Sequence, residues 1–330
     1  MAYFLSGDIG GTKTLLQLNS TIESGFPLFQ KSYASAAYKG LAEIVGIFLA
    51  EADISDIEFA CFALAAPINR RKVKITNLPW VVDADELEKL FSIRRVSFIN
   101  DFEAIGYGIN ALQPDDLLTL QSGEVREECS YLVVGAGTGL GVAWLSQYDR
   151  VIKVHPSEAG HMDFAPVSEI QILLLRYMQD RFDHVSYERL VSGPGMNSIF
   201  EFLRDTGLAK PSAQLSEAIV EDDAAAVIAR FSLIEEEVIA CMAVDLFMSI
   251  YGAFVGNMAL AVLPQGGIYI AGGIAAKLSK QMQEGNFINS FVSKGRYTEM
   301  LSKLTVHIVL NLNVGLLGAN QYAQMHRSNF

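Results

Sequence analysis

Residues 131–145 read YLVVGAGTGLGVAWL, and residues 3–18 read YFLSGDIGGTKTLLQL. Each stretch places a glycine-rich turn between two apolar runs that lack a helical period, which predicts strand, tight turn, strand. Because this local design occurs twice along the chain, we expect a duplicated α/β fold in which each half contributes one such turn. These two stretches therefore decide the fold class.

The rest of the chain predicts an alternation of helices and strands. We expect a helix over residues 41–52 and buried strands over residues 57–64, 96–99 and 268–271. The acidic runs at 221–223 and 235–237 are interpreted as solvated faces of helices.

Residues 241–264 form a long apolar segment that could span a bilayer by its length alone. Asp245 and Asn257 lie inside it, and a central aspartate costs roughly 3 kcal/mol on insertion scales. A helix buried within the protein is therefore the favoured interpretation.

With 330 residues, of which 51% are hydrophobic, the chain can fill two domains with a cleft between them. No low-complexity linker marks the boundary. We place a small domain at residues 1–111, with a C-terminal helix at 315–330 packing back on it, and a large domain at 112–314.

The formal net charge of −12 excludes a broad cationic face, so we expect neither a nucleic acid nor a membrane as partner. Cys61, Cys129 and Cys241 lie far apart, which fits neither a disulfide framework nor a zinc site and indicates a cytoplasmic protein. Residues 1–6 are interpreted as a first strand rather than a signal peptide. Because the negative net charge repels an anionic ligand, backbone N–H groups, a few lysines and a metal ion would have to bind it locally.

The two glycine turns fit that need, because glycine permits positive φ and lets backbone N–H groups approach a polyphosphate closely. The alternative is a pair of plain hairpin turns, but residues 135–141 contain four glycines, more than a hairpin requires. Neither turn fits the Walker A or the Rossmann pattern. The candidate phosphate-binding residues are Gly10, Gly11, Thr12, Gly137, Thr138 and Gly139.

Asp8 precedes the first turn, where a carboxylate would repel phosphates unless Mg²⁺ lies between them. We favour a metal role for Asp8, mediated by water, which is compatible with its alternative role as an Asx-turn former. Lys13 could pair with a phosphate or simply occupy the surface of a strand, and both interpretations stay open.

Asn100-Asp101 follows an apolar strand, so a carboxylate is presented at a strand end, a usual place for a general base. The alternative is an N-cap for the helix that starts at Phe102, but Asn100 could fill the cap and leave Asp101 for chemistry.

Glu158 and His161 are three residues apart, which in a helical turn places them on one face. A Glu-x-x-His pair can bind zinc, yet the other histidines and the cysteines show no ligand spacing. Hydrogen bonding to hydroxyls is the better interpretation. Glu188 could pair with Arg189 on a surface helix, but the four residues Asn100, Glu158, His161 and Glu188 together supply the donors and acceptors that a polyol requires.

Several of these blocks, in this order, resemble those of a known family. The matching blocks are Gly7 to Thr12, Ile99 to Phe102, Gly137 to Gly141, Ser157 to His161, Tyr187 to Gly195 and Ala271 to Ile274. The sequence is similar to bacterial glucokinases of the non-ROK type, in the hexokinase/actin-like ATPase superfamily. Two positions depart from the family pattern: Lys13 stands where asparagine is frequent, and Ala136 where proline is frequent. The cysteine-rich zinc motif of the ROK branch is absent.

The resemblance implies a two-domain actin-like ATPase (ribonuclease H-like) fold, α/β, with duplicated mixed sheets and a central cleft. It implies ATP-dependent phosphorylation of D-glucose at the 6-hydroxyl, the first step of glycolysis, with ATP and Mg²⁺ as cofactors and a possible homodimer. In that family's pattern Asp101 is the catalytic base. Glucose is held by Asn100, Glu158, His161 and Glu188, and Gly272 and Gly273 lie beside the adenosine.

Three other functions are weighed against this one. A sugar-binding regulator commonly carries a DNA-binding module before the first strand, whereas here that strand begins at Tyr3. A regulator without catalysis would also not need Asp101. A filament-forming ATPase would not need the four polyol ligands. A kinase of another hexose fits the same residues.

Overall fold

The computed structural model describes residues 3–20, 27–68, 70–124, 126, 129–149, 151–234, 237–284 and 286–326. Contacts divide the chain into two compact units. Unit 1 comprises Met1–Pro114 and Asn311–Phe330, and unit 2 comprises Asp115–Leu310. The expected domain boundaries at 111 and 315 fall close to these divisions, and the domain assignment stays a prediction.

Unit 1 alternates strands and helices in its first hundred residues. Its strands are β1 (Tyr3–Ile9), β2 (Lys13–Ser20), β3 (Phe29–Ala34), β4 (Ile57–Leu64), β5 (Lys72–Lys74), β6 (Val81–Asp83) and β7 (Arg95–Asn100). Its α-helices are α1 (Leu41–Ala52), α2 (Ala84–Phe91), α3 (Asp101–Gly108) and α13 (Val314–His326), with 3₁₀ turns η1 (Ser35–Ala37) and η2 (Ile109–Ala111). Residues 327–330 of the expected C-terminal helix lie outside the described residues.

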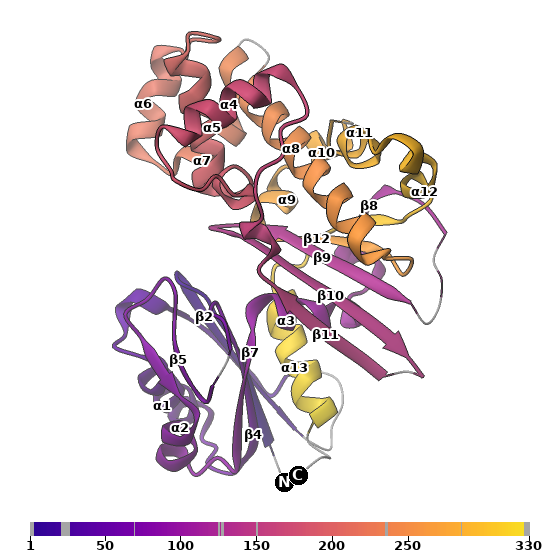
Figure 1. Ribbon diagram of the computed structural model, residues 1–330. Coiled ribbons are helices and arrows are strands. Elements are labelled where there is room, and N and C mark those ends of the chain that lie inside the picture. The colour runs from indigo at the N-terminus through magenta and orange to yellow at the C-terminus, as the bar shows by residue number, and fades with distance from the viewer. Residues whose placement is uncertain are drawn as a thin grey trace. The chain divides into compact units, whose positions relative to one another are not determined.

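The main sheet of unit 1 has the strand order β3-β2-β1-β4-β7. The first three strands are antiparallel neighbours, whereas β1, β4 and β7 run parallel. One hydrophobic cluster joins the sheet to α1 and α2, and a second joins it to α3 and α13, so helices cover both faces (Figure 1). The central parallel strand β4 is buried except at Glu58 and has a nearly continuous apolar sequence, as strands covered on both faces do.

Unit 2 is larger and richer in helix. Its strands are β8 (Leu117–Gln121), β9 (Ser130–Ala136), β10 (Leu140–Tyr148), β11 (Val151–Ser157), β12 (Ile268–Ala271) and β13 (Val306–Val309). Its α-helices are α4 (Glu169–Gln179), α5 (Gly193–Asp205), α6 (Ala213–Glu221), α7 (Ala224–Phe231), α8 (Val238–Val262), α9 (Gly273–Lys277), α10 (Ser279–Gln283), α11 (Asn286–Val292) and α12 (Thr298–Ser302). Its 3₁₀ turns are η4 (Ala159–His161), η5 (Tyr187–Arg189) and η6 (Gly295–Tyr297), and η3 (Pro114–Asp116) crosses the boundary of the units.

The sheet of unit 2 has the order β11-β10-β9-β12-β13-β8. Again three antiparallel strands, β11, β10 and β9, are followed by parallel partners, β12 and β13. The two units therefore repeat one topology, with β8 added antiparallel at the edge of the second sheet. The duplicated mixed sheets expected from the two glycine-turn stretches are confirmed.

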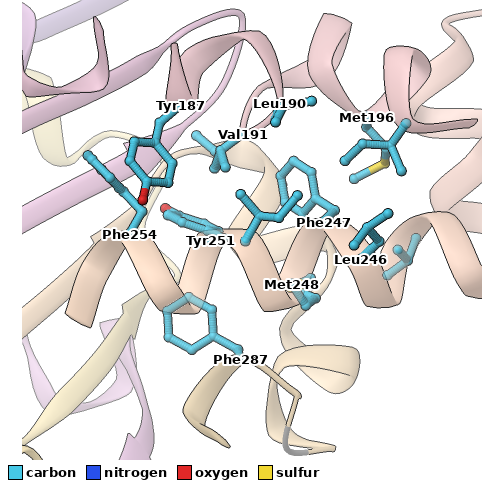
Figure 2. Close-up of a cluster of buried hydrophobic side chains, with 14 of the residues drawn as sticks. Tyr187, Leu190, Val191, Met196, Leu246, Phe247, Met248, Tyr251, Phe254 and Phe287 are labelled. Atoms are coloured by element: carbon cyan, nitrogen blue, oxygen red, sulfur yellow. The ribbon is translucent and has the colours of Figure 1, made fainter. Parts of the chain in front are cut away.

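Helix α8 supplies much of the core of unit 2. It is the one helix in the described part of the chain that is long and apolar enough to cross a membrane, and 72% of its most apolar window is buried within the protein. It packs on β9, α5, α7 and α11 (Figure 1), and Figure 2 shows its aromatic side chains Phe247, Tyr251 and Phe254 among buried neighbours. The expectation of a protein-buried helix is confirmed.

Two glycines let α8 approach α11 closely. A Cβ atom added at Gly252 would collide with the carbonyl oxygen of Phe287, and one added at Gly256 would collide with that of Phe291. The two helices therefore pack backbone against backbone at this point, as helices do where small residues recur every fourth position.

Glu221 is exposed at the end of α6, as expected, but the other described residues of the acidic runs lie outside the helices, so the expectation of helix faces is wrong for them. Asp222 and Asp223 connect α6 to α7, and the Asp223 carboxylate caps α7 by accepting the Ala225 N–H at 3.2 Å. Glu237 is the buried N-terminal residue before α8, where its carboxylate accepts the Ser212 N–H at 3.1 Å. Acidic side chains favour such helix starts because unpaired N–H groups are exposed there. Glu235 and Glu236 lie outside the described residues.

Candidate active site

The first glycine turn joins β1 to β2 as a tight hairpin. Gly10 N–H donates to the Lys13 carbonyl at 2.9 Å, and the Ser35 hydroxyl donates to the Gly10 carbonyl at 2.8 Å. Neither Gly10 nor Gly11 adopts a positive φ. The glycines provide space instead, because a Cβ at Gly11 would lie 3.1 Å from the Asn77 Cβ. Thr12 is exposed in the turn, where its hydroxyl can meet a ligand.

Asp8 lies in β1, opposite Leu15 of β2, and its carboxylate faces the first turn of α13. A Cβ at Gly315 would lie 2.9 Å from Asp8 Oδ2. Burial raises the pKa of Asp8 to about 6, and the positive charge of Lys13 opposes this rise. Among the described residues the carboxylate has no hydrogen-bond partner, so the Asx-turn alternative lacks support. A carboxylate that is desolvated and left without donors suits a cation.

Asn100 and Asp101 occupy the junction between β7 and α3. Asn100 Oδ1 accepts the N–H groups of Phe102 at 2.9 Å and Glu103 at 3.2 Å, and Glu103 Oε2 accepts the Asn100 N–H at 3.3 Å. Asn100 thus caps the helix, as anticipated, and Asp101 occupies its first turn with Oδ1 3.0 Å from the Phe102 N–H. Glu103 was missed by the sequence reasoning, although Asn-x-x-Glu is a recognisable variant of the capping box.

The register of unit 1 brings the first glycine turn and the Asn100–Asp101 junction to one edge of the sheet. Asp8 pairs with Ala63 of β4, which pairs with Ile99 of β7. The first turn and Asp101 therefore both follow the carboxyl ends of parallel strands, where ligands bind in α/β sheets. They are two strands apart, or about 10 Å at the usual strand spacing.

The second glycine turn joins β9 to β10 and is held from one side by the segment 188–193. Leu140 N–H donates to Glu188 Oε2 at 2.9 Å, and Gly193 N–H donates to the Gly137 carbonyl at 2.8 Å. A Cβ at Gly139 would lie 2.5 Å from Glu188 Oε2. Glycine at 139 is therefore needed so that a carboxylate can reach the backbone of the turn.

Glu158, His161 and Glu188 lie together in unit 2. His161 Nε2 is 3.9 Å from Glu158 Oε2, and His161 Nδ1 is 3.8 Å from Glu188 Oε1. The expected common face of Glu158 and His161 is confirmed in the 3₁₀ turn η4. These separations exceed hydrogen-bond length, so the polar atoms can exchange hydrogen bonds with the hydroxyl groups of a ligand.

The alternative role of Glu188 as a surface partner of Arg189 is wrong. The Arg189 guanidinium lies over the Phe182 ring at 4.1 Å, whereas Glu188 is tied to the glycine turn. Within the described residues no three His, Cys, Asp or Glu side chains are grouped as metal ligands, so zinc at Glu158 and His161 gains no support.

A cavity of about 560 Å³ adjoins the second turn. Gly137 and Thr138 form one wall, the start of α5 another, and the alanine-rich face of α7 a third. Gly273, at the start of α9, also lines it, and Gly272 next to it has φ +90°, with its Cα hydrogens against the Ala136 carbonyl. A largely apolar cavity beside a glycine turn suits a nucleoside whose phosphates reach the turn.

The family is decided by sequence comparison. The family described as Glucokinase matches residues 5–326 of this chain. The chain is 42% identical to the glucokinase of Nostoc sp. strain PCC 7120, over 97% of this chain and 98% of that protein. The chain belongs to the glucokinase family. It is also 38% identical to the glucokinase of Synechocystis sp. strain PCC 6803, over 96% of each chain.

Solved structures of glucokinases share the fold. The crystal structure of a glucokinase from an Antarctic psychrotroph superposes with a TM-score of 0.83 at 26% identity, over 98% of this chain and 99% of that one. A ROK family glucokinase from Streptomyces griseus, in complex with glucose and AMPPNP, superposes with a TM-score of 0.67 at 16% identity. The glucokinase family membership expected from the motif blocks is confirmed, and the actin-like ATPase fold with it.

The sequence predicted the charged residues of the candidate site more readily than the neutral residues that support them. Ser192 donates its hydroxyl to the Glu188 carbonyl at 2.8 Å and caps α5 by accepting the Gly195 N–H at 3.1 Å. Ser-Gly-Pro-Gly at 192–195, with proline in the first helical turn, is a helix-start signal that could have indicated this role.

Proposed function

We propose that this member of the glucokinase family transfers the γ-phosphoryl group of ATP to the 6-hydroxyl of D-glucose, giving glucose 6-phosphate and ADP. This reaction opens glycolysis. The observation that carries the proposal is the Glu158, His161 and Glu188 group, joined through the Leu140 N–H to the second glycine turn. These contacts bring the three polar side chains proposed to bind hydroxyl groups next to the turn proposed to bind phosphate.

Asp101 is the proposed general base. Its carboxylate takes the proton of the 6-hydroxyl while that oxygen forms a bond to the γ-phosphorus, and the bond to the β-phosphate oxygen breaks to release ADP. Two observations support this role. Asp101 lies in the first turn of α3, directly after a parallel strand, and Asn100 rather than Asp101 caps the helix.

Glucose is proposed to be held by Glu158, His161 and Glu188 through its hydroxyl groups, with Asn100 as a further ligand. Both polar atoms of the Asn100 side chain already bond to backbone, since Nδ2 donates to the Ala66 carbonyl at 3.2 Å. Its amide carries a second hydrogen that can donate to a sugar oxygen.

The proposed phosphate-binding residues are Gly10, Gly11 and Thr12 in the first turn and Gly137, Thr138 and Gly139 in the second turn. Backbone N–H groups at such turns stabilise phosphate charge without adding a formal charge. The adenosine is proposed to lie in the cavity beside Gly272 and Gly273.

Asp8 is the proposed magnesium residue, acting through water. Mg²⁺ commonly uses one or two carboxylates plus substrate phosphates, so a single carboxylate is enough. The raised pKa of Asp8 and its lack of a donor within the described residues fit that role. When bound, the ion would neutralise phosphate charge. We also propose a cytoplasmic location, consistent with three free cysteines, and a homodimer.

A coupled assay tests the function. Glucose, mannose, fructose and N-acetylglucosamine are each supplied with ATP and then with polyphosphate, and formation of the sugar phosphate is measured. We expect glucose with ATP to give the highest kcat/KM. Faster phosphorylation of another hexose would reassign the substrate, and phosphorylation of none would favour a sugar-binding regulator.

A further inference from the structure

Tyr187 connects the two segments that carry the proposed sugar ligands. Its N–H donates to the Met162 carbonyl at 3.0 Å, directly after His161 in the chain, and Glu188 follows it directly. Its own carbonyl accepts the N–H groups of Leu190 at 3.0 Å and Val191 at 2.7 Å. A shift of Tyr187 would therefore move Glu188 relative to His161.

The Tyr187 side chain is anchored in the core of unit 2. Only 3% of the residue is exposed, and its ring packs 4.6 Å from the Phe254 ring of α8 and edge-on to Phe164 at 5.7 Å, measured between centroids. Figure 2 shows the Tyr187 and Phe254 rings together at one end of the aromatic cluster. Ring packing holds the side chain by apolar contact and a preferred ring geometry, but it does not bond the side chain to a particular atom of α8.

The Tyr187 hydroxyl supplies the directional contact. It accepts a hydrogen bond from Asn257 Nδ2 at 3.0 Å. Burial raises the pKa of Tyr187, so the hydroxyl stays neutral in the working range of the enzyme. The hydroxyl therefore ties the backbone that precedes Glu188 to α8.

Asn257 is, with Asp245 and Ser249, one of the few polar residues in the apolar sequence of α8. Its side chain is exposed, so the core does not require an amide at this position. The bond to Tyr187, 70 residues away in the chain, is what the amide adds.

We propose that Tyr187 and Asn257 are positioning residues of the sugar site, which hold Glu188 and His161 at the spacing that accepts sugar hydroxyls. This inference rests on the proposed function. The two residues touch no substrate in the proposal; they fix the backbone on either side of the ligand-binding carboxylate and imidazole, as a supporting shell must.

The test uses Tyr187→Phe, Asn257→Ala and the double variant of the full chain. Asn286→Ala is the matched control, because Asn286 Nδ2 also donates to α8, at Asp245 Oδ1 over 3.1 Å. Calorimetric titration gives the Kd for glucose without nucleotide and the Kd for AMPPNP without sugar, and thermal unfolding gives Tm.

We expect each single variant to bind glucose roughly threefold to tenfold more weakly, the scale of one lost hydrogen bond. The double variant should be no weaker than the poorer single variant, because both changes remove one contact. The Kd for AMPPNP should stay at the parent value, and Tm should differ from that of the control variant by no more than a few degrees.

Three results would overturn the inference while leaving the proposed function in place. Glucose affinity equal to the parent in both single variants is the first. The second is a parallel loss of glucose affinity, AMPPNP affinity and Tm, which would indicate general destabilisation. The third is an equal loss in Asn286→Ala. A parent chain that binds no glucose would instead reject the proposed function and the inference together.

Discussion

The two glycine turns occupy equivalent places in equivalent sheets, yet their surroundings differ. The β1–β2 turn is braced by the neutral Ser35 hydroxyl, and the neighbouring Asp8 carboxylate has no hydrogen-bond donor among the described residues. The β9–β10 turn is braced by a carboxylate, since Glu188 accepts the Leu140 N–H at 2.9 Å. The two units therefore share one strand topology, but the carboxylates beside their glycine turns differ in their hydrogen-bond partners.

The difference indicates a division of labour. In unit 1 the carboxylate of Asp8 stays unneutralised at a desolvated position, which favours a cation. In unit 2 the carboxylate of Glu188 is oriented by the turn and presents its other oxygen to His161 at 3.8 Å. Unit 1 should therefore dominate the chemical step, and unit 2 should dominate sugar affinity.

Replacing Asp101 with alanine is the strongest test of this division. We expect kcat to fall by roughly two to four orders of magnitude, the usual contribution of a general base, while the Kd for glucose changes little because unit 2 is intact. Steady-state kinetics and calorimetry measure the two quantities. Asp56→Ala, at an exposed residue before β4, is the control and should keep the parent kcat. Near-parental turnover in Asp101→Ala would remove its role.

Replacing Gly139 with alanine should affect unit 2 through Glu188. The new Cβ would lie 2.5 Å from Glu188 Oε2, so the carboxylate must move away from the turn. We expect glucose binding, titrated without nucleotide, to weaken roughly tenfold or more, the loss of a charge-assisted hydrogen bond. Gly137→Ala is the comparison, because nothing lies within 4 Å of its added Cβ. Equal glucose affinity in the two variants would contradict the proposed link.

Replacing Asp8 with asparagine should stabilise the ligand-free protein while it lowers activity. Burial raises the pKa of Asp8 from its ordinary value of 3.8 to about 6 in the folded protein, so the folded state binds this proton more tightly than the unfolded state. Ionisation of Asp8 therefore costs stability as pH rises from about 4 to 6, and that cost persists above pH 6. We expect Asp8→Asn to raise the free energy of unfolding by about 1–3 kcal/mol at pH 7.5.

Thermal unfolding between pH 5 and pH 8 checks this prediction, since the gain should shrink as the pH falls below 6. A variant less stable than the parent at pH 7.5 would show that the Asp8 carboxylate is not under desolvation strain.

Local patterns in the sequence predicted most of the fold. The helix over 41–52 and the strand over 57–64 were predicted with the observed bounds, and the two hairpins were predicted in the right places with longer turns than observed, because each is encoded within a few neighbouring residues. The roles of Asp222, Asp223 and Glu237 were not, since charge alone does not distinguish a helix face from a helix start.

The candidate site likewise contains one proximity that the sequence predicted and contacts that it did not. Glu158 and His161 are near in sequence, and their proximity followed from spacing. The bond from Leu140 to Glu188 spans 48 residues, and that from Asn257 to Tyr187 spans 70, so no periodicity reveals either. Such contacts depend on the packing of α5 and α8 around the sheet.

The glycines at which α8 meets α11 have a consequence for how variation in this family is interpreted. Any side chain at Gly252 or Gly256 would separate two helices whose backbones touch. A mutational scan would therefore score both positions as intolerant, although neither contacts a proposed ligand. Intolerance at these two positions would report the close packing of a helix pair and not a ligand contact.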